Sequence, residues 1–222
     1  MHTTQATKTL IQCDFDGTIT DKDVSFFLLD AFADGDWRQL LEEYKEGKIS
    51  VGAFNRRAFA MVKADKLTLL EFMLTGDKVK VRPGFQELLD YCSGKGFRFV
   101  IVSNGLVFYI DAILTNMGLN NIEVFSAQSW FSPEGMVVKY IGPDGSELED
   151  SFKETYIKLF LREGYRVVYA GNGVSDIYPA RRAHHVFATG DLLERCQETN
   201  LDCTPFDDLH DVVKSLELLQ LS

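Results

Sequence analysis

The stretch that decides the fold is KTLIQCDFDGT, residues 8–18. Its first part, Lys8–Asp14, is short and mostly β-prone, and charge and Gly17 follow at once, as expected for a buried strand that leads into a loop. Asp14 and Asp16 leave this strand two residues apart, and Gly17 lets backbone N–H groups approach an anion. Taken alone, such a pair fits a solvated turn at a strand end better than a catalytic site.

Beyond this stretch, the hydrophobic pattern changes twice. From about residue 21 to residue 77 the apolar side chains recur at helical spacing, so nearly all of this segment is predicted to be helix. Arg82-Pro83-Gly84 interrupts the pattern, after which strands and helices alternate. We predict strands over 97–102, 122–126, 166–170 and 185–188, helices over 85–93, 106–117, 152–163 and 191–198, and a hairpin over 129–146.

This alternation predicts an α/β fold with a Rossmann-like parallel sheet, covered by helices on both faces and joined by right-handed crossovers. Sites in such sheets lie beyond the carboxyl ends of the strands. The helical segment follows the first strand directly, so we expect it to form a cap over that end of the sheet. The predicted domains are an α/β core of residues 1–20 and 81–222 and a helical cap of residues 21–80.

The composition narrows the class of protein. The 222 residues carry a formal charge of −10, which argues against a nucleic-acid groove and requires any phosphate site to bring its own cations. No apolar run is long enough to cross a bilayer, so we expect a cytoplasmic protein with no membrane partner. The four cysteines include no CxxC pair and are expected to be reduced thiols. The charge is compatible with a monomer or a homodimer.

Two further polar clusters follow predicted strands. Ser103-Asn104-Gly105 precedes a predicted helix, where hydroxyl and N–H groups favour a phosphate, although such a cluster is also an ordinary helix cap. The stretch from Gly171 to Asp176 offers an amide oxygen, on Asn172, and a carboxylate that can complete the oxygen shell of a cation. Lys153 can pair with phosphate and offset repulsion between carboxylates, although a lysine at a helix start is usually solvated.

Together with Asp14 and Asp16, these clusters are predicted to converge on one edge of a single parallel sheet. Neither chance nor a purely structural role of each cluster explains this convergence well. A Mg²⁺ between the two aspartates would hold Asp14 ionised for attack on phosphorus. Asp16 can protonate the leaving oxygen and then deprotonate the water that cleaves the phospho-aspartate. The sequence therefore predicts a Mg²⁺-dependent phosphatase that acts on a small phosphorylated metabolite.

The order DxDGT, SNG, lysine and GxGxxD resembles the signature of the haloacid dehalogenase superfamily over about residues 10–188. The helical insertion between the first two motifs is similar to the C1-type cap of the subgroup that contains phosphoserine phosphatase. The CDFDGTIT opening, with Asp23 beyond it, and the spacing from Lys153 to Asn172 are most similar to the phosphatases of methionine salvage.

The resemblance implies a role for each matching residue. Asp14 is implied as the nucleophile and a Mg²⁺ ligand. Asp16 is implied as the general acid and base, which also binds Mg²⁺ through its backbone carbonyl. Ser103 and Lys153, with N–H groups near Asn104, are implied to hold the phosphoryl oxygens and to stabilise the charge that develops on them.

Two positions depart from what the resemblance implies. Asn172 stands where the family usually has a metal-binding aspartate, so we expect weaker Mg²⁺ binding and a larger share for Asp176, directly or through a water. In phosphoserine phosphatases an acidic residue near the position of Asp23 and an arginine near Arg56 or Arg57 hold the amino acid. Here Asp23 replaces the longer glutamate, and both arginines also fit a solvated helix face.

Three alternatives remain open at the level of sequence. A receiver-like signalling domain would carry its phospho-accepting aspartate on a later strand, which here ends in Ser103, and it has no place for the helical insertion. A degenerate member that binds a phosphorylated ligand without hydrolysing it is motivated by Asn172, while the retention of Asp14 and Asp16 counts against it. A phosphomutase is also possible, although no residue points to a sugar phosphate. Fold alone does not decide among them.

Overall fold

The structure, a computed structural model, describes residues 8–76 and 78–219, so the parts of the predicted domains at residues 1–7, 77 and 220–222 lie outside the described residues. The described strands are β1 (Thr9–Cys13), β2 (Arg98–Leu106), β3 (Glu123–Trp130), β4 (Val137–Ile141), β5 (Glu147–Leu148), β6 (Arg166–Gly171), β7 (His185–Ala188) and β8 (Thr204–Pro205). The described helices are α1 (Val24–Phe32), α2 (Trp37–Lys45), α3 (Val51–Phe59), α4 (Lys66–Leu74), α5 (Phe85–Lys95), α6 (Val107–Asn116), α7 (Phe152–Arg162), α8 (Ile177–Ala180), α9 (Gly190–Thr199) and α10 (Leu209–Leu218), with a 3₁₀ turn at Val174–Asp176.

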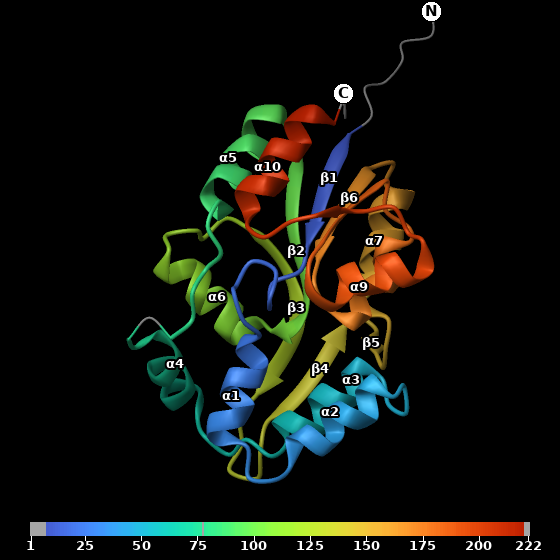
Figure 1. The fold of residues 1–222 in the computed structure, drawn as a ribbon. Coiled ribbons are helices and arrows are strands. Elements are labelled where there is room, and N and C mark those ends of the chain that lie inside the picture. Colours follow the sequence, from blue (N-terminus) through green and yellow to red (C-terminus); the bar gives the residue numbers. More distant parts are fainter. Residues whose placement is uncertain (1–7, 77, 220–222) are drawn as a thin grey trace, which may run out of the picture.

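The described strands form one sheet in the order β5-β4-β3-β2-β1-β6-β7-β8. The six strands from β3 to β8 in this order pair in parallel, and β4 and β5 extend one edge antiparallel as the predicted hairpin. In Figure 1, α5, α6 and α10 lie on one side of the sheet, and α7 and α9 lie on the other. The predicted α/β class with a parallel sheet is therefore confirmed.

Strand β1 lies in the middle of the sheet, between β2 and β6, and all five of its residues are buried. Leu10, Ile11 and Cys13 supply apolar surface, which suits a strand covered on both faces. Gln12 is buried too, and its side-chain amide donates a hydrogen bond to the backbone carbonyl of Lys153 at 3.1 Å. The start of α7 is thus tied to the strand that carries Asp14 into the site.

Two strands run further than the sequence predicted. β2 continues from Val102 to Leu106 with a shift in its register to β3, and α6 begins only at Val107. Ser103-Asn104-Gly105 therefore lies in the irregular end of a strand, and the expected helix cap is not formed there. β3 extends to Trp130 because its second half pairs with β4. Both errors have the same cause, since pairing with a neighbour, rather than local composition, decides where these strands end.

The segment between β1 and α5 contains four short helices, called here the inserted helices (α1–α4). Each begins after a short polar residue whose side chain accepts a hydrogen bond from a backbone N–H three residues later, which satisfies an otherwise free amide. These capping residues are Asp23, Asp36, Ser50 and Asp65. Figure 1 places the inserted helices beyond the end of the sheet at which β1 stops. No helix in the described part of the chain has the length and apolarity to cross a membrane.

The inserted helices leave and rejoin the sheet at one place. Thr20 and Val81 form an isolated antiparallel bridge, and the Asp21 N–H donates to the carbonyl of Lys80 at 3.0 Å. The predicted boundaries after residue 20 and before residue 81 fall at this crossing. The division into two domains stays a prediction.

Arg82 ties this crossing to two other segments. Its guanidinium donates to the carbonyls of Gly17 and Thr18, at 2.9 and 3.0 Å, in the loop that follows β1. It also donates to the carbonyl of Asp207 at 2.6 Å, shortly before α10. One side chain thereby fixes the loop after β1 against the end of the insertion and the segment that leads into α10.

The turn between β3 and β4 packs against the inserted helices. Gly135 has a φ of +134°, and a Cβ at this position would lie 2.0 Å from the carbonyl oxygen of Ala60, so the close approach requires glycine. The N–H of Met136 donates to the carbonyl of Phe59, the last residue of α3, at 3.2 Å. The predicted hairpin therefore joins α3 to the sheet.

We expect Arg82→Ala to lower the free energy of unfolding by about 2 kcal/mol, because three carbonyls lose a charged donor that is partly shielded from water. The measurement is urea unfolding followed by circular dichroism. Arg38→Ala is the matched control, since Arg38 makes an exposed ion pair with Asp30 whose loss costs about 0–1 kcal/mol. Equal losses of unfolding free energy for the two variants would contradict the stabilising role assigned to Arg82.

Candidate active site

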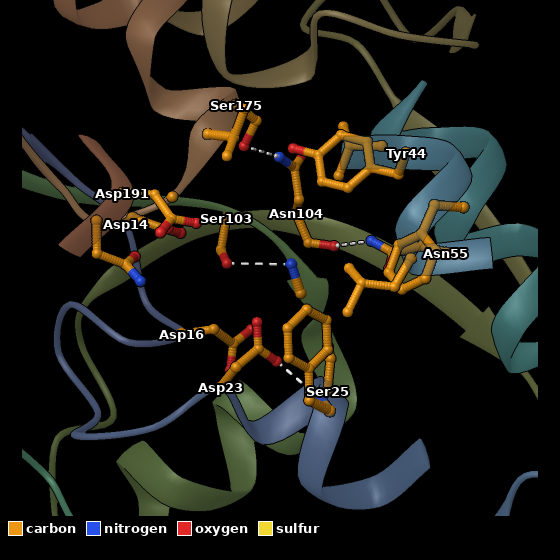
Figure 2. Close-up of a pocket in the computed structure, with 18 of the residues that line it drawn as sticks. Asp14, Asp16, Asp23, Ser25, Tyr44, Asn55, Ser103, Asn104, Ser175 and Asp191 are labelled. Carbon is orange, nitrogen blue, oxygen red and sulfur yellow. Dashed lines mark hydrogen bonds between the residues drawn. The ribbon is translucent and has the colours of Figure 1, made fainter. Parts of the chain in front are cut away.

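A cavity of about 140 Å³ lies at the carboxyl ends of the central strands. Seven of the ten predicted site residues line it, namely Asp14, Asp16, Asp23, Ser103, Asn104, Lys153 and Asn172. The structure thus brings the three motifs and the lysine together, as the convergence of strand ends predicted. Figure 2 shows Asp14 and Asp16 on one side of the cavity and Tyr44 and Asn55, from α2 and α3, on the other.

Asp14 is buried and is held by two donors. The N–H of Phe15 donates to Oδ1 at 2.7 Å, and the Lys153 ammonium lies 2.6 Å from Oδ2. Burial raises the pKa of Asp14 to about 7, although Lys153 acts to lower it. Burial would lower the pKa of Lys153, but the carboxylates of Asp14 and Asp176 raise it above its usual range. Lys153 is therefore cationic at neutral pH, and the ionisation of Asp14 depends on nearby positive charge.

Asp176 occupies a different place from the one the sequence suggested. It is fully buried, and Oδ1 accepts from the Lys153 ammonium and from the Tyr169 hydroxyl, both at 2.6 Å. Oδ2 accepts from the N–H groups of Asn172 and Gly173 at 2.9 and 2.8 Å. Both oxygens are engaged by protein donors, and Asp176 is absent from the cavity wall. These contacts favour a role in orienting Lys153 and the turn at Asn172 over the expected role of a metal ligand.

Asp16 has donors at both carboxylate oxygens. The Tyr109 hydroxyl donates to Oδ2 in a short hydrogen bond, and the Val24 N–H donates to Oδ1 at 3.0 Å. A Cβ at Gly105 would lie 2.3 Å from Oδ2, so this position has to remain glycine. Burial and the charge of Asp23 raise the pKa of Asp16 well above its ordinary value. Its surroundings therefore favour the protonated form that a general acid needs.

The SNG segment presents a buried hydroxyl to the cavity. Ser103 is 1% exposed, and its Oγ accepts from the N–H of Gly105 at 3.1 Å. The side-chain amide of Asn104 donates to Ser175 at 3.1 Å, and its backbone carbonyl accepts from the Asn55 side chain at 3.0 Å, as Figure 2 shows. The segment is thereby hydrogen-bonded to the GxGxxD motif, residues 171–176, on one side and to α3 on the other.

Asn172 lies against the loop that follows Asp14. Its Oδ1 accepts a hydrogen bond from the Thr18 hydroxyl at 2.9 Å. Gly17 has a φ of +72°, and a Cβ there would lie 2.2 Å from the Asn172 side-chain nitrogen. The glycine of the first motif is therefore needed both for the turn and for the close approach of Asn172.

Of the three residues proposed for substrate recognition, only Asp23 lines the cavity. Asp23 lines the cavity and caps α1 by accepting from the Phe26 N–H at 2.9 Å, and burial raises its pKa to about 6. Arg57 instead pairs with Glu43 at 2.8 Å, and Arg56 donates to the carbonyl of Glu149 at 3.4 Å. Neither arginine is among the described residues that line the cavity. The solvated-face interpretation fits the exposed Arg57, whereas the half-buried Arg56 is engaged by the carbonyls of Leu148 and Glu149.

Comparison with known families agrees with the geometry. The family of haloacid dehalogenase-like hydrolases matches residues 11–181, a range that includes the first motif, SNG, Lys153 and the last motif. The chain belongs to the haloacid dehalogenase-like hydrolases. Its predicted resemblance is confirmed, and the receiver-like signalling domain is set aside.

Relatives of this hydrolase are phosphatases. The 2-hydroxy-3-keto-5-methylthiopentenyl-1-phosphate phosphatase of Brevibacillus brevis is 27% identical over 217 residues, which cover 96% of this chain and 97% of the relative. The enzyme of the same name from Geobacillus thermodenitrificans is 29% identical over 214 residues, with 94% and 96% coverage. Family and relatives together confirm the prediction of an enzyme of the phosphatase class, similar to those of methionine salvage.

Solved structures of phosphoserine phosphatases share the fold. One determined as a phospho-aspartyl intermediate analogue superposes with a TM-score of 0.69 at 19% identity and covers 94% of this chain and 98% of its own. The phosphoserine phosphatase from T. onnurineus gives a TM-score of 0.69 at 20% identity, with 98% coverage of both chains. The predicted architecture, with helices inserted after the first strand, is thus that of known hydrolases of this type.

Sequence patterns missed several residues at or beside the cavity. Asp191, in the first turn of α9, lines the cavity and follows β7 at the same edge of the sheet, so the strand-end rule that found the other residues would also have found it. Tyr109 and Asn55 lie within helices and gave no such signal. They reach the site only because α6 and α3 pack beside the strand ends.

The donor set of the cavity suits a hard divalent cation. Asp14, Asp16, Asp23 and Asp191 line it, and Lys153 is its buried cation, so oxygen ligands and negative charge are in excess. Among the described residues, no group of three or more His, Cys, Asp or Glu side chains is arranged to hold a metal ion. A Mg²⁺ site here would need neutral oxygen ligands or water besides carboxylates, a mixture that Mg²⁺ commonly accepts.

We expect Lys153→Gln to destabilise the protein by about 3 kcal/mol or more, because it leaves the buried carboxylates of Asp14 and Asp176 without their shared cation. Urea unfolding in EDTA measures the effect. Lys158→Gln, on the exposed face of the same helix, removes an ion pair with Glu154 and serves as the control. A loss no larger than that of the control would contradict the structural role of the Lys153 ion pairs.

Proposed function

We propose that this hydrolase is a Mg²⁺-dependent phosphomonoesterase that acts through a phospho-aspartate on Asp14. The observation that supports the proposal most is the placement of Asp14 beside the ammonium of Lys153, with Ser103 and Asp16 in the same cavity. This group contains a nucleophile, two donors for phosphoryl oxygens and a second carboxyl for proton transfer.

In the first step, a carboxylate oxygen of Asp14 attacks phosphorus and the bond between phosphorus and the ester oxygen breaks. Asp16 gives its proton to that leaving oxygen, so the alcohol departs neutral. The Lys153 ammonium and the Ser103 hydroxyl bind the phosphoryl oxygens, where charge is concentrated during transfer. Because Lys153 is already fixed by Asp176, it needs little rearrangement to do so.

In the second step, Asp16, now a carboxylate, takes a proton from water. The water oxygen bonds to phosphorus and the bond between phosphorus and Asp14 breaks, which releases inorganic phosphate and restores both aspartates. The raised pKa of Asp16 supports both duties, since the group has to carry a proton in one step and accept one in the next.

Three groups of this chain would hold Mg²⁺: the Asp14 carboxylate, the Asp16 backbone carbonyl and the Asn172 amide oxygen. When bound, the ion supplies positive charge beside Asp14 and the phosphoryl group. Asn172 contributes an oxygen without a charge, so we propose a weaker Mg²⁺ site than one with a third carboxylate. Asp176 stays with Lys153 in this assignment.

We propose that the inserted helices act as a cap that selects the substrate. They give the cavity an apolar wall formed by Phe26, Leu41, Tyr44, Val51 and Phe54. A small phosphorylated metabolite with an apolar group at its other end fits such a wall. The relatives named for 2-hydroxy-3-keto-5-methylthiopentenyl-1-phosphate support a phosphate monoester that carries a methylthio group. Phosphoserine fits less well, since Arg56 and Arg57 pair elsewhere.

The monomeric or homodimeric state and a cytoplasmic location stay predictions.

We expect phosphate release from small phosphomonoesters that requires Mg²⁺, stops in EDTA and falls at least about a thousandfold in Asp14→Asn. A panel of esters assayed for inorganic phosphate tests this. Asp30→Asn, an exposed residue paired with Arg38, is the control and should keep full activity.

The same panel distinguishes the second candidate, a degenerate protein that binds a phosphorylated ligand without turnover, which Asn172 favours. In that case the wild type would release no phosphate from any ester, and Asn172→Asp would restore phosphate release. Activity of the wild type contradicts this candidate.

We expect Leu41→Ala to lower kcat/KM for a phosphate monoester that carries a methylthio group by about tenfold, because this substrate loses apolar contact in the cavity. Inorganic phosphate alone does not reach this wall, so its inhibition constant should not change. Leu67→Ala, an exposed residue of α4, is the control. A parallel weakening of inorganic phosphate would contradict the assignment of Leu41 to the apolar end of the substrate.

A further inference from the structure

Tyr109 is a buried polar side chain that neither proposed step uses. It lies on α6, is 0% exposed, and donates its hydroxyl proton to Oδ2 of Asp16. The Ser25 oxygen lies 2.8 Å from the Tyr109 oxygen. Each hydroxyl can donate and accept, so Tyr109 links Ser25 to Asp16 in one hydrogen-bonded chain.

The position of the Tyr109 hydroxyl is fixed by packing. Its ring lies between Phe15 and Phe108, with ring centroids 6.5 and 5.4 Å away. A Cβ at Gly105 would lie 2.1 Å from the hydroxyl oxygen, so the absence of a side chain there provides the space it occupies. The hydroxyl therefore has one available site, and that site is next to Asp16.

This arrangement holds both oxygens of Asp16. Oδ2 is hydrogen-bonded to the Tyr109 hydroxyl, a group that can donate to a carboxylate or accept from a carboxylic acid. Oδ1 is held by the backbone N–H of Val24, whose neighbour Ser25 bonds to Tyr109. The carboxyl group is thus hydrogen-bonded to α6 through Oδ2 and to the first turn of α1 through Oδ1.

We infer that Tyr109 is a positioning residue, which holds the Asp16 carboxyl group in the orientation from which it gives a proton to the leaving oxygen. The inference rests on the proposed function, in which Asp16 is the general acid. Tyr109 does not touch substrate in this assignment. It acts by removing the freedom of the Asp16 side chain to rotate, and proton transfer requires such alignment.

A role in proton donation makes the effect of Tyr109 depend on the leaving group. An alkyl alkoxide is too basic to depart without a proton, whereas p-nitrophenolate is stable as an anion. Loss of the hydroxyl should therefore slow the first turnover with an alkyl ester and leave the first turnover with p-nitrophenyl phosphate unchanged. A residue that only stabilises the fold would affect both esters equally.

The test compares Tyr109→Phe with the wild type in single-turnover experiments on these two esters, using the alkyl ester that the wild type hydrolyses fastest. We expect the alkyl ester to be cleaved about tenfold more slowly, with KM unchanged, and p-nitrophenyl phosphate to be cleaved at the wild-type rate. Tyr156→Phe is the matched control, since its hydroxyl bonds to the Ile141 carbonyl at 3.2 Å, away from Asp16. Ser25→Ala, a smaller change, should give the same selectivity to a lesser extent if Tyr109→Phe folds poorly.

A double-mutant cycle separates this inference from the proposed function. In an Asp16→Asn background, Tyr109→Phe should have no further effect on the alkyl ester, because the group it positions is already absent. Equal losses on both esters, or a full further loss in the Asp16→Asn background, would overturn the role of Tyr109 alone. If Asp16→Asn itself does not distinguish the two esters, the proposed general acid is wrong and the inference fails with it.

Discussion

The buried ammonium of Lys153, placed between Asp14 and Asp176, is the interaction on which the rest of the site depends. Each of its two ion pairs measures 2.6 Å, and all three side chains are almost completely buried. Two carboxylates at this depth would be strongly unfavourable without a shared cation. The lysine comes from the first turn of α7, whose backbone is hydrogen-bonded to Gln12 of β1, so the central strand of the sheet and the surroundings of Asp14 are linked by the same few contacts.

The Lys153 ion pairs also bear on the asparagine at position 172. Asp176 is committed to Lys153, Tyr169 and two backbone amides, so it does not replace the charge that an aspartate at position 172 would provide. Asn172 keeps its oxygen beside the catalytic loop through Thr18. An amide oxygen here contributes no negative charge beside Asp14, a difference from a carboxylate that is expected to affect cation affinity more than the position of Asp14.

The inserted helices and the acid residue are linked structurally. Helix α1 supplies both Val24, which donates to Asp16, and Ser25, which bonds to Tyr109, while its cap Asp23 lines the cavity. The turn between β3 and β4 supports α3 from the other side through Phe59 and Gly135. The apolar wall of the cavity and two of the groups around Asp16, Val24 and Ser25, therefore belong to the same inserted segment, while Tyr109 comes from α6.

The sequence by itself determined the order of elements, the parallel α/β sheet and the convergence of Asp14, Asp16, Ser103, Lys153 and Asn172, because apolar strands that end in polar clusters place those clusters at one sheet edge. Only the tertiary structure decided the direction of each side chain. It assigned Asp176 to Lys153, extended β2 through Ser103, and separated Arg56 and Arg57 from the cavity. It also brought Tyr109 and Asn55 to the site. These outcomes depend on which helix packs beside which strand end and on which partner a buried polar group finds, and periodicity along one chain carries no information about either.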